Sequence, residues 1–308
     1  MNIVFMGNPH FAVTSLRRLH QSHHKIIAVV TNPPKRAGRG RSVQESPVSI
    51  AAKEAHLKRV EIGNLHSDEA VNTLRNFNAD AFVVVAYRIL PNQLVGIPKL
   101  GAINLHGSLL PKYRGAAPIQ WALINGDNST GLTTFIIESK IDTGKILMQQ
   151  LVNIEPDDDY GSLAKKMGYA GAELLLETLD RLDKRRIIPR PQNDKEASAA
   201  PKITPALAKI NWENSAIEIH NLARGLSPLP GIQTILKNKK IKLFSTHDIG
   251  NNSDFQPGIV SGIEPDKILI QTRSGQLSVS EVQLEGKKRL LVSEFLHGYP
   301  VEIGTKLG

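Results

Sequence analysis

Two patterns of hydrophobic residues divide the chain into two parts. In the first part, short runs rich in Val and Ile alternate with segments whose apolar residues recur at helical spacing. Runs such as IIAVVT (26–31) and AFVVVAY (81–87) are continuous, which indicates strands buried on both faces of a parallel sheet. Helices are predicted between and after the strands, at residues 10–20, 46–57, 67–77 and 159–183. This alternation predicts an α/β domain with a doubly wound, mostly parallel sheet at residues 1–183.

The pattern changes after residue 183. Residues 184–205 (KRRIIPRPQNDKEASAAPKITP) contain four prolines and many charges without periodicity, so we expect a linker there. Beyond it, a helix at 215–226 precedes short strands that are separated by Gly, Pro, Asn and Asp. Strands at this spacing predict a small β-barrel domain at residues 206–308.

Composition excludes several classes of protein. The chain has no cysteine, which rules out disulfides, thiol nucleophiles and Cys-ligated zinc. The N-terminus does not have the pattern of a signal peptide, and no stretch approaches the roughly 20 apolar residues of a membrane span. We therefore expect a cytoplasmic protein. His20, His23 and His24 lie near the end of a predicted helix, where cationic side chains suit the helix dipole, and no metal site is expected.

The first strand is followed by GNPHF (7–11), at the position of a dinucleotide-binding loop. The segment lacks G-x-G-x-x-G, and Pro9 stands where a flexible glycine would be needed. NAD binding is therefore disfavoured.

Asn104 and His106 end a predicted strand in INLHGSLLPKYRG (103–115). Residues i and i+2 of a strand point to one face, so the two side chains project together at the carboxyl edge of the sheet, where such folds bind ligands. A hydrogen-bonded structural His and a turn-forming Asp142 (in IDTGK) are the plain alternatives. If Asp142 lies beside His106, it would orient and tune the imidazole for acid–base work, while Asn104 donates to a developing oxyanion. That trio suits direct transfer of an activated acyl group to an amine.

Two basic clusters favour an RNA partner. PPKRAGRGR (33–41) holds Arg36, Arg39 and Arg41, with glycines and no acidic residue, and KNKKIK (237–242) would give a barrel strand a basic face. Arg pairs well with phosphate, and barrels of this kind often bind oligonucleotides. A solvated surface loop is the alternative for either cluster.

The string N-x-H-x-S-L-L-P (104–111), the following YRGAAPIQ and the DTG at 142–144 resemble the formyltransferase family that uses 10-formyltetrahydrofolate. The resemblance covers the whole chain and implies a Rossmann-like domain followed by an OB-fold-like domain. It implies formyl transfer from 10-formyltetrahydrofolate to the methionine amino group of charged initiator tRNA, by a monomer that needs no metal. The family pattern further implies three sets of site residues: catalytic Asn104, His106 and Asp142; folate-lining Ser108, Leu109, Leu110 and Pro111; and tRNA-contacting Arg36, Arg39 and Arg41.

One segment departs from the family pattern. Where many members have A-Y-G-x-I-L-P, this chain has AYRILP (86–91), one residue shorter and with a bulky Arg88. Formyl transfer to an amino sugar-nucleotide is an alternative function, because formyltransferases for such substrates have a motif similar to NLHGSLLPKYRG. A formyltransferase of the purine pathway would not need the basic loop and second domain. A non-enzymatic RNA-binding protein on the same fold is the alternative from another class.

Overall fold

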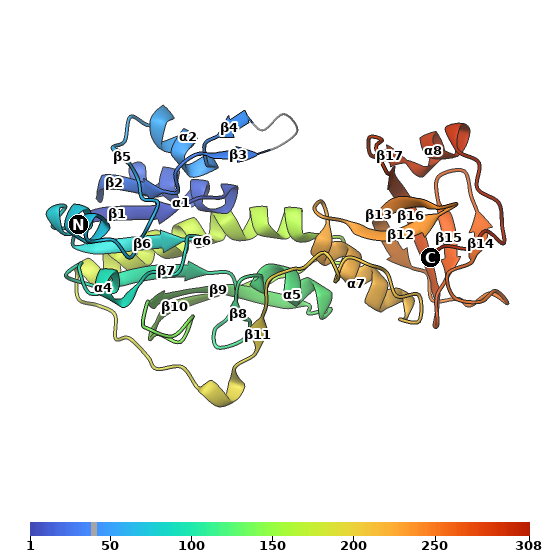
Figure 1. Cartoon of the computed structure of the whole chain (residues 1–308). Helices are drawn as coiled ribbons and strands as arrows, with labels where there is room; N and C mark the ends of the chain where they lie inside the picture. Colours follow the sequence, from blue (N-terminus) through green and yellow to red (C-terminus); the bar gives the residue numbers. More distant parts are fainter. Residues whose placement is uncertain (38–41) are drawn as a thin grey trace. The chain divides into compact units, whose positions relative to one another are not determined.

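The structure, a computed structural model, describes residues 1–37 and 42–308. Contacts divide these residues into two compact units, each built from several segments (Figure 1). The first unit comprises Met1–Pro118, Thr130–Asn153 and Ala164–Pro201. The second comprises Ile119–Ser129, Ile154–Leu163 and Lys202–Gly308.

A seven-stranded sheet forms the centre of the first unit, in the order β10-β9-β7-β6-β1-β2-β5. Its strands, in chain order, are β1 (Asn2–Gly7), β2 (Lys25–Thr31), β5 (Arg59–Glu61), β6 (Ala81–Val85), β7 (Ala102–His106), β9 (Ser129–Ile136) and β10 (Ile146–Asn153). The five strands from β5 to β7 are parallel, and β9 joins β7 in the antiparallel sense. The chain starts in the middle of the sheet, builds one side, and returns to build the other from β6. The predicted doubly wound, mostly parallel sheet is confirmed.

The apolar runs form strands because helices cover them. β6 is buried along its whole length, as its unbroken apolar sequence predicts. The helices of this unit are α1 (His10–His20), α2 (Pro47–Glu54), α3 (Asp68–Asn76), α4 (Asn92–Val95) and most of α6 (Tyr160–Asp183). On α6, Gly171 allows close packing on β7, since a Cβ there would lie 2.8 Å from a methyl of Leu105. This packing supports the strand that carries Asn104 and His106.

The second unit is an antiparallel sheet in the order β12-β13-β16-β15-β14, with β17 beside β16. Its strands are β12 (Ile232–Leu236), β13 (Lys239–Asp248), β14 (Val260–Ile263), β15 (Ile268–Gln271), β16 (Gln276–Leu284) and β17 (Leu290–Leu291). Helices α5 (Pro118–Ile124, which begins in the first unit), α7 (Ala216–Leu226) and α8 (Val292–Gly298) complete it. The last residues bridge both edges of the sheet, since Leu307 pairs with Leu236 and Lys306 with Ile259. These bridges close the sheet into the expected small barrel.

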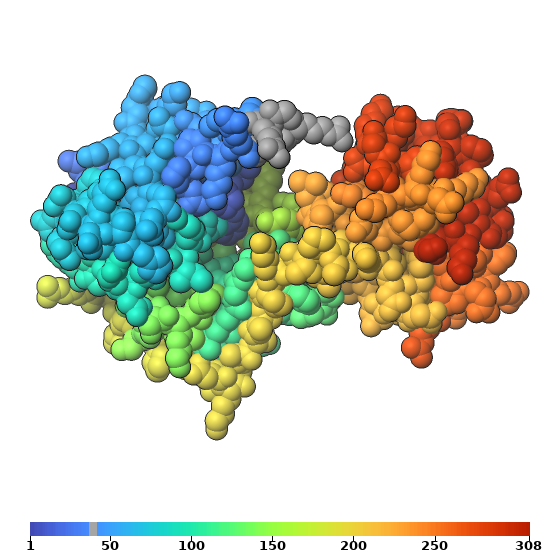
Figure 2. Space-filling model, viewed as in Figure 1, coloured from blue at the N-terminus to red at the C-terminus, as the bar shows by residue number. Residues whose placement is uncertain are grey.

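The segment expected as a linker is partly built into the first unit. Its residues as far as Pro201 belong to that unit, and β11 (Ala199–Ala200) pairs in parallel with β8 (Arg114–Gly115). A short 3-10 helix, η1 (Asp194–Glu196), precedes β11. The segment is nevertheless exposed along most of its length (Figure 2).

The basic segment 33–41 contains β3 (Lys35–Ala37), which pairs with β4 (Ser42–Gln44) in an antiparallel ladder. Arg36 is exposed on β3, whereas Arg39 and Arg41 lie outside the described residues. No helix in the described ranges has the length and hydropathy that a membrane crossing requires.

Candidate active site

Asn104 and His106 lie on β7, between β6 and β9 in the sheet. Strand alternation places their side chains on the same face, as the sequence predicts. His106 is only 6% exposed, whereas Asn104 is partly open to solvent. Within the described ranges, the Asn104 amide has no hydrogen-bond partner. It therefore keeps an N–H available for a ligand.

The imidazole of His106 is fixed through one ring nitrogen. Nε2 lies 2.9 Å from the carbonyl oxygen of Tyr113, and because a carbonyl can only accept, Nε2 carries a proton and donates it. Tyr113 adopts the left-handed conformation (φ 60°), which directs its carbonyl to this position. The other nitrogen, Nδ1, lies 3.7 Å from Oδ2 of Asp142. Nδ1 is therefore the ring atom available for proton exchange.

Asp142 reaches His106 by way of a loop that doubles back. The loop after β9 begins at the far end of β7, where the Ile137 N–H donates to the Ala102 carbonyl. At Gly144 the loop passes against β9 so closely that a Cβ would lie 1.7 Å from the Ile136 oxygen. Asp142 itself is left-handed (φ 53°), and its Oδ2 accepts the Gly115 N–H at 2.8 Å. The expected neighbours His106 and Asp142 are thus brought together, although the loop does not start at the carboxyl edge of β7.

The turn Ser108–Pro111 directly follows β7. The Ser108 hydroxyl donates to the Lys112 carbonyl, and the Leu110 N–H donates to Thr133 Oγ1 at 3.0 Å. Leu110 is buried, whereas Leu109 and Pro111 are half-buried. These polar groups of the turn thus form hydrogen bonds within the protein. The turn can therefore offer a ligand mainly apolar surface.

In the AYRILP segment, Arg88 is tied to the loop after β5. Its guanidinium donates to the carbonyls of Ile62 and Gly63 and to the Tyr87 hydroxyl. Ile89, next to it, is 70% exposed. The segment lies at the carboxyl edge beside β7, so Ile89 gives this edge an exposed apolar side chain.

Sequence reasoning missed one residue that touches the Asp142 loop. Gln192, in the segment predicted as a linker, donates from Nε2 to the carbonyls of Asp142 (2.9 Å) and Gly144 (2.8 Å). No local sequence signal marks this contact, because the residues that it joins are about 50 positions apart.

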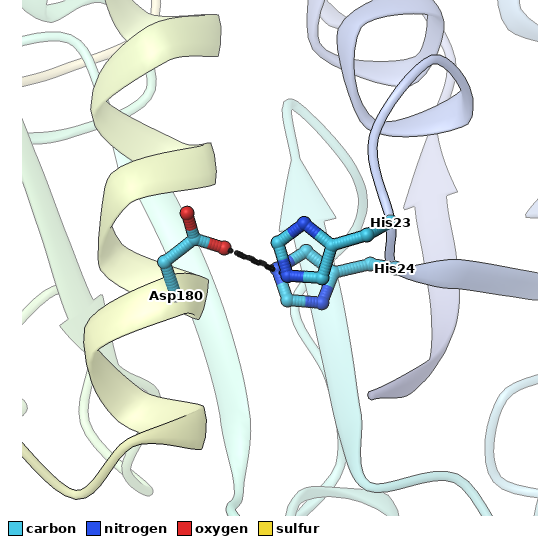
Figure 3. Close-up of side chains that lie close together, drawn as sticks. All are labelled: His23, His24 and Asp180. Carbon is cyan, nitrogen blue, oxygen red and sulfur yellow. Dashed lines mark hydrogen bonds and ion pairs between the residues drawn. The ribbon is translucent and has the colours of Figure 1, made fainter.

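A second histidine cluster lies at the start of β2, against the end of α6 (Figure 3). His24 Nε2 and His23 Nε2 lie 2.9 and 3.3 Å from Oδ1 of Asp180, a donor set that a metal ion could use. However, His24 Nδ1 faces the terminal ammonium of Met1 at 3.3 Å. A metal-bound His normally donates its second N–H to an acceptor, which this arrangement does not provide. Burial, helped by the Met1 charge and His23, lowers the pKa of His24. We interpret the cluster as a contact that joins β2 to α6.

Comparison with known proteins identifies relatives along the whole chain. The family model described as "Formyl transferase" matches residues 1–179, and "Formyl transferase, C-terminal domain" matches residues 202–300. The chain is 42% identical to the methionyl-tRNA formyltransferase of Desulforamulus reducens, covering 100% of this chain and 98% of that protein. It is 40% identical to the enzyme of the same name from Caldanaerobacter subterraneus subsp. tengcongensis, with full coverage of both.

Two solved structures share the fold at low sequence identity. HypX from Aquifex aeolicus in complex with tetrahydrofolic acid has a TM-score of 0.66 at 16% identity, covering 98% of this chain and 48% of that one. The N-formyltransferase from Helicobacter canadensis, in complex with folinic acid and dTDP-3-aminofucose, has a TM-score of 0.67 at 20% identity, covering 94% and 99%.

Proposed function

Because the chain belongs to the formyltransferase family, we propose that it transfers the formyl group of 10-formyltetrahydrofolate to the methionine amino group of charged initiator tRNA. The product is N-formylmethionyl-tRNA, which serves translation initiation. The observation that carries the chemistry is the placement of Asp142 beside Nδ1 of His106. Asn104 lies on the same strand face, and its amide has no hydrogen-bond partner among the residues that the structure describes. We also propose that the enzyme works as a cytoplasmic monomer.

The side chains divide the chemistry among them. 10-Formyltetrahydrofolate supplies the activated formyl group. The acceptor nitrogen bonds to the formyl carbon, the bond from that carbon to the folate nitrogen breaks, and a proton passes from the acceptor to the leaving nitrogen. Asn104 donates an N–H to the formyl oxygen as negative charge develops there, and His106 stabilises the same charge. His106 Nδ1 relays the proton, and Asp142, whose carboxylate faces that nitrogen, offsets the positive charge that the ring gains.

The folate is proposed to bind beside the turn after β7, lined by Ser108, Leu109, Leu110 and Pro111. Leu109, Pro111 and the exposed Ile89 provide apolar surface at this edge, which suits a flat pterin ring. The polar atoms of the turn serve to hold its shape, since they bond within the protein.

The test is transfer of labelled formyl from 10-formyltetrahydrofolate to charged initiator tRNA. Elongator methionyl-tRNA and a UDP-amino sugar serve as alternative acceptors, and we expect transfer to the initiator alone. Preference for the sugar would contradict the proposal.

Substitutions test the three assigned roles. His106→Ala and Asp142→Ala should each lower turnover about 10²–10⁴-fold, the usual effect of losing an acid–base group. Asn104→Ala should lower it about 10²–10³-fold, as for one oxyanion donor. Binding of both substrates should change little, and the exposed His66→Ala is the control. Near-normal turnover in any of the three variants would refute the role of that residue.

We further propose three regions with distinct roles: a catalytic domain at residues 1–183, a linker at 184–205, and a tRNA-binding domain at 206–308. The change from buried strands to a small barrel supports this division. Limited proteolysis should cut within 184–205, where residues 184–186 are exposed and basic, and a digest that never cuts there would argue against the division.

A further inference from the structure

Residues 190–200, which we term the strap, belong to the first unit and lead into β11 (Figure 1). At one end, Arg190 and Ile146 exchange backbone hydrogen bonds of 2.8 and 2.9 Å. At the other end, β11 pairs with β8. The strap is therefore attached at both ends, and Gln192, near its first end, contacts the loop that carries Asp142.

Gln192 makes four hydrogen bonds from one side-chain amide. Besides its two donations to the Asp142 and Gly144 carbonyls, its Oε1 accepts from Arg114 Nη2 at 2.7 Å and Nε at 3.1 Å. An amide has two N–H donors and two oxygen lone pairs, so its capacity is fully used. Gln192 thus joins the Asp142 loop to the segment that follows the Ser108–Pro111 turn.

The same strap holds the groups that bind His106 and Asp142. Ser198 Oγ accepts the Tyr113 N–H at 2.9 Å, and the Ser198 carbonyl accepts the Arg114 N–H at 2.8 Å. Tyr113 provides the carbonyl that binds His106 Nε2, and Gly115 provides the N–H that binds Asp142. Both members of the His106–Asp142 pair therefore depend on residues that the strap contacts.

Other residues must hold His106 and Asp142 in place, because the two side chains do not bind each other directly. The 3.7 Å between His106 Nδ1 and Asp142 Oδ2 is too long for a hydrogen bond. Asp142 also has a positive φ, a conformation that surrounding structure must maintain.

We propose that Gln192 is a positioning residue for formyl transfer: it holds the Asp142 loop so that the carboxylate faces His106 Nδ1. The proposal rests on the roles assigned above to His106 and Asp142. Gln192 itself has no reactive group suited to proton transfer and acts through the loop.

Two substitutions separate the bonds that Gln192 makes. Gln192→Glu keeps oxygen acceptors for Arg114 but removes both donations to the loop. Gln192→Met removes the bonds to Arg114 and to the loop, while its side chain has a similar length. Each should lower kcat about 10–100-fold, the usual effect of removing a partner that orients a functional side chain. KM for both substrates should stay within about twofold of the wild-type value, since positioning changes the chemical step. The pH profile of kcat should also change for both.

The matched control is the neighbouring Asn193→Ala. Asn193 caps η1 and bonds to Glu196, so its loss perturbs the strap without touching the Asp142 loop. Its kcat should stay near that of the wild type. An equal loss of kcat in Asn193→Ala would overturn the proposal, because any perturbation of the strap would then lower kcat, whether or not it involves the bonds of Gln192.

Coupling to Asp142 gives a second test. In an Asp142→Asn background, adding Gln192→Met should lower kcat less than about threefold further, because the carboxylate to be positioned is already gone. Full additivity of the two losses would overturn the proposal.

Amide hydrogen exchange at residues 138–145 tests positioning without turnover. In the unliganded enzyme, Gln192→Met should accelerate exchange in this loop about tenfold or more, with a melting temperature close to that of the wild type. If amide exchange in this loop were unchanged in Gln192→Met, the positioning role would be refuted even if kcat fell. If the wild type transferred no formyl to tRNA, the proposed function would fail, whereas this measurement would still decide what Gln192 does to the loop.

Discussion

At the scale of single residues, Gly144 determines whether Asp142 can reach His106. The loop turns back along β9 only because no Cβ stands between its backbone and the Ile136 carbonyl, as the 1.7 Å approach shows. Any side chain there forces the loop away from β9, and the carboxylate two residues earlier moves with it.

Gly144→Ala should therefore lower turnover about tenfold or more, since displacement of a functional group by about 1 Å can cost about 10²-fold. The matched control is Gly96→Ala, because a Cβ at Gly96 meets nothing within 4 Å. Formyl transfer by purified variants is the measurement. Wild-type turnover in Gly144→Ala would show that the loop tolerates displacement.

At the scale of elements, α7 packs on β13 through a histidine that is kept neutral. His220 Nδ1 lies 3.0 Å from Thr246 Oγ1, and its ring stacks with His247 at 5.6 Å. Burial, then the positive Arg224 and His247, lower the pKa of His220 to about 4, although Asp248 and Thr246 act in the opposite direction. Charging this histidine therefore disfavours the folded barrel.

The unfolded chain takes up this proton near pH 6.5, whereas the folded chain does so only near pH 4. The stabilisation is fully present above about pH 6.5 and is lost as pH falls toward 4, because the unfolded state binds more protons in this window. The whole shift corresponds to about 3 kcal/mol, and since solvent reaches part of the ring we expect about 1–2 kcal/mol.

His220→Gln should flatten this pH dependence, whereas the exposed His66→Gln should preserve it. Urea unfolding between about pH 4.5 and 7.5 measures the effect. Trp121 and Trp212, the two tryptophans of the chain, belong to the second unit, so their fluorescence reports on the relevant part. Parallel pH profiles for His220→Gln and the wild type would refute the assignment.

The elements that could be predicted are those with local causes. β2 and β6 follow from Val- and Ile-rich runs, and α6 from its helical spacing, because each pattern reflects burial of that segment alone. The pairing of β8 with β11 and the folding back of the Asp142 loop depend on residues distant in sequence. Gln192 could not be predicted for the same reason. Asn104 and His106 are predicted as site residues because they share one strand face and because the motif around them resembles that of the formyltransferase family.

At the scale of the whole molecule, positive charge is the feature that concerns the tRNA partner. Arg36 is exposed on β3, and Lys239 and Lys240 are exposed at the start of β13. Arg39 and Arg41 are proposed to act with Arg36 on the phosphates of the tRNA, because charge-assisted Arg–phosphate pairs are strong.

Arg39→Ala/Arg41→Ala should weaken tRNA binding and flatten its salt dependence by roughly one unit of slope for each phosphate that the protein no longer neutralises. Folate affinity should not change, because the folate is proposed to bind beside the turn after β7 and not at residues 33–41. The measurement is tRNA affinity over a salt series for the double variant and the wild type. If the variant and the wild type have equal slopes and affinities, residues 33–41 are best interpreted as a solvated surface loop.

The attachment of the strap also has a consequence for the order in which the enzyme matures during synthesis. Tyr113 and Ser198 are 85 residues apart in sequence, so their contact is highly non-local. A nascent chain that has emerged only as far as residue 183 contains every strand of the large sheet, together with Asn104, His106 and Asp142. It still lacks the partners of Tyr113, Arg114 and the Asp142 loop. The proposed catalytic geometry is therefore completed only when residues 190–200 have also emerged from the ribosome.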